Sequence, residues 1–138
     1  MKIASEQEML DFGKSIAEKI SVPCVIELLG DVGTGKTTFT RGLAVGLGVN
    51  EPVTSPSFTI SKAYSFKKND SECELIHYDF YRLPEPGLMA EDLNESLNNN
   101  HAIVVVEWAA SVENLLPENR MKIEITLNDD GTRKVTIK

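Results

Sequence analysis

The segment Gly30-Asp31-Val32-Gly33-Thr34-Gly35-Lys36-Thr37 has the residue types and the spacing of a phosphate-binding loop. Glycines let the backbone turn tightly and aim successive N–H groups at phosphate oxygens, and a helix beginning near Lys36 adds the positive end of its dipole. Lys36 is expected to reach the β- and γ-phosphates, and the Thr37 hydroxyl is placed to bind Mg²⁺. The loop therefore predicts a site for ATP and Mg²⁺, with nucleotide contacts from Asp31, Val32, Gly33, Thr34, Gly35, Lys36, Thr37 and Thr38.

Two carboxylates follow apolar runs and are candidates to complete this site. Glu107 follows Ile103-Val104-Val105-Val106, and Asp79 follows Leu75-Ile76-His77-Tyr78. Ligands of open α/β sheets bind at the carboxyl ends of the strands, where a phosphate-loop site needs an acidic group. One carboxylate would hold the metal and the other would orient the attacking water. The sequence leaves the two roles open, and we favour Glu107 for the metal.

Three further features each have a functional and a plainer interpretation. Trp108 directly follows Glu107, so it is expected either to lie against the nucleotide or to pack in the core. The hydroxyls of Thr54-Ser55-Pro56-Ser57 suit either a switch that senses the γ-phosphate or a polar turn. His77 lies within an apolar run, and we expect it to pack within a strand rather than to catalyse.

Periodicity and turn residues predict the elements that position these groups. A capping-box pattern at Ser5-Glu6-Gln7-Glu8 begins the first helix, and Pro23 follows its end. The predicted helices cover roughly residues 6–20, 36–47 and 89–97. The predicted strands cover 24–29, 58–66, 74–78, 102–106, 123–127 and 133–137, with turns at 67–70 and 128–131. This order predicts one α/β phosphate-loop domain over residues 1–138, with a mainly parallel sheet flanked by helices and a C-terminal antiparallel hairpin.

Composition limits the classes of function. The 138 residues suffice for one packed core, and the net charge of −7 opposes non-specific binding to nucleic acid. No apolar run approaches the ~18 residues of a membrane span, and no secretion signal is visible, so we expect a cytoplasmic protein that does not enter membranes. Cys24 and Cys73 have no metal-ligand spacing and are expected to be reduced thiols.

Four motifs together resemble the bacterial TsaE family, also called YjeE, the ATPase component of tRNA threonylcarbamoyladenosine biosynthesis. They occur in the family's order: the phosphate loop from Leu29 to Phe39 with Arg41-Gly42-Leu43, then Val53-Thr54-Ser55-Pro56-Ser57-Phe58-Thr59, His77-Tyr78-Asp79-Phe80-Tyr81-Arg82-Leu83, and Val106-Glu107-Trp108. Leu115-Leu116-Pro117 fits the family's downstream segment. Three departures are Asp31-Val32-Gly33-Thr34-Gly35 within the loop, Ser57 where the family usually has threonine, and Pro84-Glu85-Pro86-Gly87-Leu88 after Arg82, where the family usually has an acidic helix.

The resemblance implies a role within a larger machine. Family members work with the TsaD and TsaB proteins, which transfer a threonylcarbamoyl group to adenosine 37 of tRNA. ATP hydrolysis by a chain of this kind would reset the TsaB–TsaD complex between cycles. The acidic charge agrees with contact to tRNA only indirectly, through these partners.

Three other classes remain as alternatives. A small nucleotide or metabolite kinase usually surrounds the transferred phosphoryl group with several cations, whereas only Arg41 and Arg82 lie near the motifs. A GTP-dependent switch would carry a guanine-reading Asn-Lys-x-Asp, which the sequence lacks. A binding module without turnover has the same motifs as an ATPase, and only kinetics separates the two.

Overall fold

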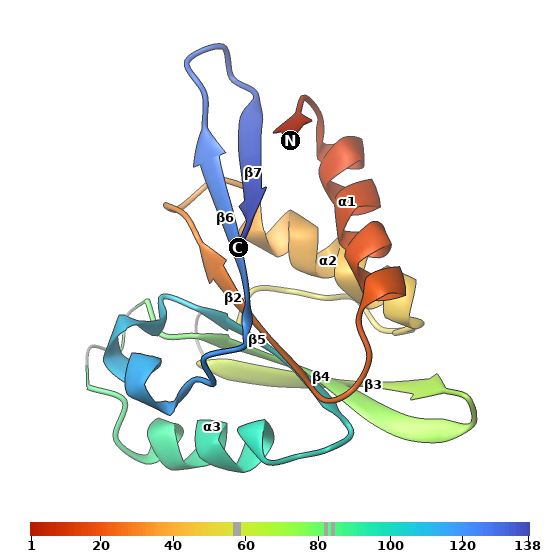
Figure 1. Ribbon diagram of the computed structural model, residues 1–138, viewed down its shortest axis with the longest axis vertical. Coiled ribbons are helices and arrows are strands. Elements are labelled where there is room, and N and C mark those ends of the chain that lie inside the picture. The colour runs from red at the N-terminus through yellow and green to blue at the C-terminus, as the bar shows by residue number, and fades with distance from the viewer. Residues whose placement is uncertain (57–58, 82, 84) are drawn as a thin grey trace.

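The computed structural model describes residues 1–56, 59–81, 83 and 85–138, which form a seven-stranded sheet with helices on both faces (Figure 1). The strands are β1 (Lys2–Ile3), β2 (Cys24–Leu29), β3 (Ser61–Lys68), β4 (Ser71–Asp79), β5 (Ala102–Glu107), β6 (Met121–Leu127) and β7 (Arg133–Ile137). The helices are α1 (Glu6–Lys19), α2 (Lys36–Leu47) and α3 (Leu88–Leu97), with a 3₁₀ helix η1 (Ala109–Leu115).

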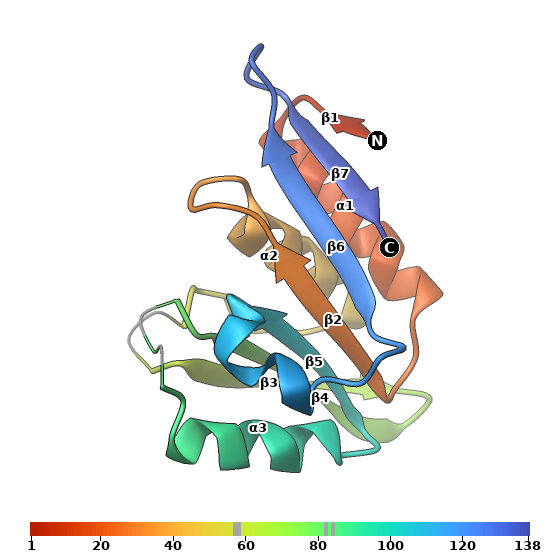
Figure 2. The same cartoon turned by 60° about the vertical axis from the view of Figure 1, so that its left-hand side comes forward.

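The strand order is β1-β7-β6-β2-β5-β4-β3. The four central strands β6, β2, β5 and β4 are parallel, whereas β3 pairs with β4, and β7 with β6 and β1, in antiparallel fashion. Figure 2 shows the β6–β7 hairpin and β1 on one side of β2, with β5, β4 and β3 on the other. The expected α/β architecture, with a mainly parallel centre and a C-terminal hairpin, is confirmed.

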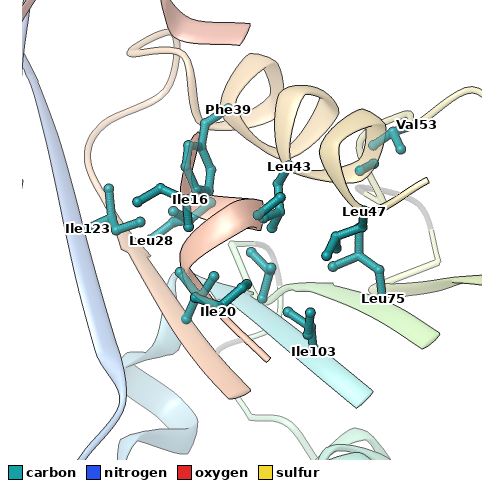
Figure 3. Packing of buried hydrophobic residues seen from close by; sticks show 14 of the residues in the cluster. Ile16, Ile20, Leu28, Phe39, Leu43, Leu47, Val53, Leu75, Ile103 and Ile123 are labelled. Carbon is teal, nitrogen blue, oxygen red and sulfur yellow. The ribbon is translucent and has the colours of Figure 1, made fainter. Parts of the chain in front are cut away.

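Helices α1 and α2 cover one face of the sheet and enclose the larger core. Figure 3 shows apolar side chains of the helices, Ile16, Phe39, Leu43 and Leu47, and Ile20 just after α1, packed with Leu28, Leu75, Ile103 and Ile123 of the strands. Complete burial of each such side chain contributes about 1.5–3 kcal/mol. The apolar i, i+4, i+8 spacing of Phe39, Leu43 and Leu47 thus seats the helix that begins at the phosphate loop.

Two glycines let α1 and α2 pack with their backbones close together. A Cβ atom on Gly42 would lie 2.2 Å from the carbonyl oxygen of Leu10, and one on Gly13 would lie 2.4 Å from that of Phe39. Neither carbonyl can move without breaking its own helix, so a larger side chain at either glycine would force the helices apart. This close crossing fixes α2, and with it the loop that precedes α2, against the N-terminal helix.

The opposite face carries α3 and η1, which pack over a second apolar cluster. Leu93 of α3 and Val112 of η1 are fully buried there with Tyr78, Val104 and Val106 of the strands. None of the described helices is long and apolar enough to cross a membrane.

The structure differs from the sequence-based expectation around the β3–β4 turn. Lys67 and Lys68 continue β3, and only Asn69 and Asp70 form the turn, both with positive φ (52° and 65°). A two-residue turn with positive φ at both positions matches the twist of an antiparallel hairpin, and lysines are well tolerated on an edge strand. β3 begins at Ser61 rather than near Phe58, which itself lies outside the described residues.

The helix ends and the shortest elements also refine the expectation. α1 ends at Lys19, before Pro23, and Ser5 caps its start by accepting a hydrogen bond from the Glu8 N–H at 3.1 Å. The short strand β1 and the 3₁₀ helix η1 were not expected, because two to seven residues carry too little periodicity to be recognised. Leu127 and Ile137, the last residues of β6 and β7, are exposed.

Candidate active site

The phosphate loop joins the end of β2 to the start of α2, as the sequence predicts. Gly30 and Gly35 have φ of 149° and 111°, which other residues rarely adopt. A Cβ atom on Gly30 would also lie 2.4 Å from the carbonyl oxygen of Ile125 in β6, so no side chain fits there. The loop is therefore a tight turn whose shape depends on glycine and whose end is the N-terminus of a helix.

Arg133 of β7 ties this loop to the C-terminal hairpin. Its Nε donates to the carbonyl oxygen of Thr34 at 3.2 Å, and its Nη2 donates to that of Gly33 at 3.2 Å. The Thr34 hydroxyl in turn donates to the carbonyl oxygen of Asp31 at 3.0 Å. The sequence does not predict this role for Arg133, because roughly a hundred residues separate it from the loop and no local pattern indicates the contact.

Lys36 is a buried cation at the centre of the site. Its side chain is 6% exposed, its ammonium donates to the carbonyl oxygen of Gly30, and Nζ lies 3.8 Å from Oε1 of Glu107. The ammonium also lies 4.2 Å from the ring centroid of Trp108, within the range of a cation–π contact. Burial lowers the pKa of Lys36, and the charges of Glu107, Asp79 and Asp31 oppose that shift.

The two predicted carboxylates lie side by side at the same edge of the sheet. Asp79 and Glu107 are register partners at the ends of the parallel strands β4 and β5, and both are at least nine-tenths buried. Oδ1 of Asp79 accepts a hydrogen bond from the Tyr81 N–H at 2.9 Å. Burial raises the pKa of Asp79, and the Tyr81 N–H, which favours the charged form, opposes that rise. The parallel register thus accounts for the meeting of two acids far apart in sequence.

His77 belongs to this group, although sequence analysis assigned it only to packing. It is fully buried in β4, as expected, but its Nε2 is hydrogen-bonded to Oε2 of Glu107. One signal was available in the sequence, because His77 and Asp79 are two residues apart and side chains with that spacing share one face of a strand.

A cavity of about 520 Å³ opens between the loop, the carboxylates and the N-terminus of α1. Of the predicted site residues, it is lined by Val32, Gly33, Gly35, Lys36, Thr37, Thr38, Asp79, Glu107 and Trp108. Asp31 and Thr34 do not line it and instead bond to each other within the loop. The cavity has further walls that sequence analysis did not predict, namely Ile3, Ser5, Glu6, Met9, Tyr81 and Arg133.

Trp108 forms part of the cavity rim and has an unusual backbone conformation. Its φ of 56° places it in the left-handed region, directly after β5 and before η1. The indole packs against the ring of Tyr81, with 4.7 Å between the centroids. The residue therefore lies beside the loop lysine and also packs against an aromatic neighbour, and its contact with a nucleotide stays a prediction.

The segment that follows α2 is anchored at Val53 and Thr54. Arg41 donates from Nε to the carbonyl oxygen of Val53 at 3.2 Å, and the hydroxyl of Tyr64 accepts from the Thr54 N–H at 3.2 Å. Ser55 lines the cavity. Ser57 of the proposed switch segment, together with Phe58, Arg82 and Pro84 of the motifs, lies outside the described residues.

The polar groups in the cavity suit a nucleoside triphosphate with a divalent cation. A glycine loop at a helix N-terminus and a buried lysine match phosphate, while the Thr37 hydroxyl and two carboxylates are oxygen ligands of the kind that Mg²⁺ prefers. Two buried acids beside one lysine also leave excess negative charge, which a cation would compensate. The arrangement can therefore bind phosphates and position both a metal ion and a water molecule.

Comparison with known proteins gives one consistent result. Residues 3–135 match the family described as "Threonylcarbamoyl adenosine biosynthesis protein TsaE". The tRNA threonylcarbamoyladenosine biosynthesis protein TsaE of Bacillus subtilis is 42% identical over 81% of this chain and 67% of that protein. The protein of the same name from Nostoc is 31% identical over 98% of this chain and 82% of that protein. The crystal structure of YdiB from Bacillus subtilis superposes with a TM-score of 0.80 at 34% identity, covering 99% of this chain and 82% of that one.

Proposed function

The chain belongs to the TsaE family, whose members take part in tRNA threonylcarbamoyladenosine biosynthesis, and we propose that within this pathway it binds and hydrolyses ATP with Mg²⁺. We further propose that hydrolysis resets a complex of the TsaB and TsaD proteins between cycles of modification at adenosine 37. The net charge of −7 supports a division of labour in which these partners carry the tRNA.

One observation carries the proposal: the buried Lys36 at the phosphate loop faces two buried carboxylates from neighbouring strands. A structural ion pair needs one acid, and a second buried acid is costly to the fold unless it serves the site. Lys36, Glu107 and Asp79 line the same cavity as Thr37 and the glycines of the loop. This set supports phosphate binding, metal binding and the positioning of a water molecule, which are the parts that phosphoryl transfer to water takes from the phosphate-loop chain itself.

The proposed roles follow from position and donor type. Lys36 would exchange its contacts with Gly30 and Glu107 for phosphate oxygens. Thr37 and Glu107 would hold Mg²⁺, which when bound neutralises charge that develops on the phosphoryl group. Asp79, whose raised pKa favours proton uptake, would orient the attacking water and accept its proton.

The experiment measures nucleotide binding and turnover separately. Calorimetry with ATP and Mg²⁺ should give saturable binding to the wild type, and Lys36→Ala should abolish most of it. Phosphate release should be slow for the isolated chain and faster with TsaB and TsaD, because the described site contains no arginine beyond Arg133. Unchanged affinity in Lys36→Ala would refute the site, and equal rates with and without the partners would favour a self-sufficient enzyme such as a small kinase.

A further inference from the structure

His77 is a buried polar side chain whose position invites a functional explanation. It is 0% exposed and lies in β4, between the edge strand β3 and β5, where its register partners are Lys62 and Val105. Its Nε2 is hydrogen-bonded to Oε2 of Glu107, whereas Nδ1 has no hydrogen-bond partner among the described residues. Burial of an imidazole is unfavourable unless it is hydrogen-bonded, so the contact with Glu107 is what compensates it.

The unpartnered Nδ1 identifies the tautomer of the ring. A neutral imidazole has one N–H donor and one bare nitrogen, and an ionised carboxylate only accepts hydrogen bonds. The nitrogen that faces Glu107 must therefore carry the hydrogen, and the bare lone pair is left at Nδ1. This is the less costly choice, because the reverse tautomer would place two acceptors in contact and bury an unpaired N–H.

The hydrogen bond from His77 determines how the Glu107 carboxylate is oriented. Its Oε2 is held by His77, and its Oε1 lies 3.8 Å from the Lys36 ammonium on the side of the phosphate loop. The hydrogen bond from His77 to Oε2 restrains the carboxylate of Glu107 from rotating away from the cavity. Groups that hold a metal ligand in this way commonly change metal affinity by roughly 10–100-fold when they are removed.

We propose that His77 is a positioning residue, which through its Nε2–H holds Oε2 of Glu107 and thereby keeps Oε1 directed to the divalent cation that accompanies the nucleotide. This inference rests on the proposed function, since it assumes that Glu107 serves the cation. The other inward residues of the same strand face, Cys73 and Leu75, are apolar, so packing alone does not call for an imidazole at this position.

The test compares two substitutions of similar size. His77→Gln can present an amide N–H near the place of Nε2, whereas His77→Met fills similar space without a donor. His101→Gln, at the exposed second histidine, is the matched control. Calorimetry with a non-hydrolysable ATP analogue is performed once in EDTA and once across a Mg²⁺ series, which gives metal-free nucleotide affinity and apparent Mg²⁺ affinity for each variant.

We expect His77→Met to weaken apparent Mg²⁺ affinity by about 10-fold or more while metal-free nucleotide affinity stays within about 3-fold of wild type. His77→Gln should recover most of the Mg²⁺ affinity, and His101→Gln should resemble the wild type. Equal Mg²⁺ affinity in folded His77→Met and His77→Gln would overturn the proposal, as would parallel loss of metal-free and metal-dependent binding. If the wild type itself shows no Mg²⁺ enhancement, the proposed function fails as well.

A second measurement does not depend on nucleotide or on the stability of a variant at His77. The ¹⁵N chemical shifts of the imidazole in the wild type, assigned by comparison with His101→Gln, report which nitrogen carries the hydrogen. We expect hydrogen on Nε2 and a bare Nδ1, and we expect this pattern to lose its single-tautomer character in Glu107→Ala. Hydrogen on Nδ1 in the wild type would overturn the proposal even if His77→Met did not fold.

Discussion

Arg120 and Glu27 form a buried ion pair in which loss of either partner alone is expected to cost much stability, with no effect on chemistry. Nε of Arg120 donates to Oε1 of Glu27 at 2.7 Å, and the two side chains are 7% and 8% exposed. Arg120 also donates from Nη1 to the carbonyl oxygen of Pro117 at 2.9 Å. The pair therefore pins the connection between η1 and β6 to β2, the strand that leads into the phosphate loop.

Replacement of Arg120 by Met would leave the Glu27 carboxylate buried without its cation. Loss of one partner from a buried pair costs about 3–5 kcal/mol, a large part of the ~5–15 kcal/mol that stabilises a typical domain. The double variant Glu27→Leu/Arg120→Met removes both charges and should return to within about 1–2 kcal/mol of the wild type. The exposed contact of Arg120 with Glu113, at 3.6 Å, supplies the control, since Glu113→Gln should cost less than ~1 kcal/mol.

The assay is urea unfolding followed by circular dichroism, with the coupling energy taken from the double-mutant cycle. We expect a coupling of at least ~2 kcal/mol between the two positions, since each single change leaves a buried charge that the double change removes. A cost of less than ~1 kcal/mol for Arg120→Met, or simple additivity of the two single changes, would contradict the predicted energetic coupling between Glu27 and Arg120.

Three further predictions concern the site and its support. Glu107→Gln and Asp79→Asn should each reduce phosphate release by roughly 10²-fold while the protein stays folded, and wild-type turnover in either would remove that residue from the mechanism. Titration with ATP and Mg²⁺ should change the fluorescence emission of Trp108, the one tryptophan in the sequence, because Lys36 would leave the indole ring for the phosphates. Lys36→Ala should give no response. An unchanged emission when calorimetry shows saturation would contradict a role for the Lys36–Trp108 contact. Gly42→Ala should destabilise the protein by about 1–3 kcal/mol because the new Cβ atom clashes with α1. The clash should outweigh the higher helix propensity of alanine, which is worth up to ~1 kcal/mol. A stabilised variant would show that α1 and α2 can move apart without cost.

The sequence predicts the parts of the fold that local chemistry determines. The strand–loop–helix unit from Cys24 to Leu47 was expected with nearly the observed boundaries, because an apolar run, glycines and an i, i+4 stripe succeed one another there. The meeting of Asp79 and Glu107 was also foreseeable, since parallel strands end at a common edge. These expectations needed only the type of each residue and the direction of its strand.

Contacts between distant segments were not foreseeable in the same way. Arg133 reaches the loop from β7 because the hairpin returns beside β6, an arrangement that no local pattern specifies. The pairing of Glu27 with Arg120 across β2 and the approach to β6 has the same origin. A charged residue within a strand is normally placed on a solvated face, and only the structure shows that Glu27 is buried and paired with Arg120.

The contacts of Lys36 imply that the proposed binding of nucleotide would be an exchange of contacts rather than a simple addition. A buried ammonium needs partners, and here the carbonyl oxygen of Gly30, the carboxylate of Glu107 and the face of Trp108 provide them. In the proposed function, phosphates would have to compete with these three contacts, and a cation would take over the Glu107 oxygen that Lys36 leaves. Affinity for phosphate and affinity for the cation would then be coupled through one carboxylate, and His77, which is hydrogen-bonded to the other oxygen of that carboxylate, would influence both.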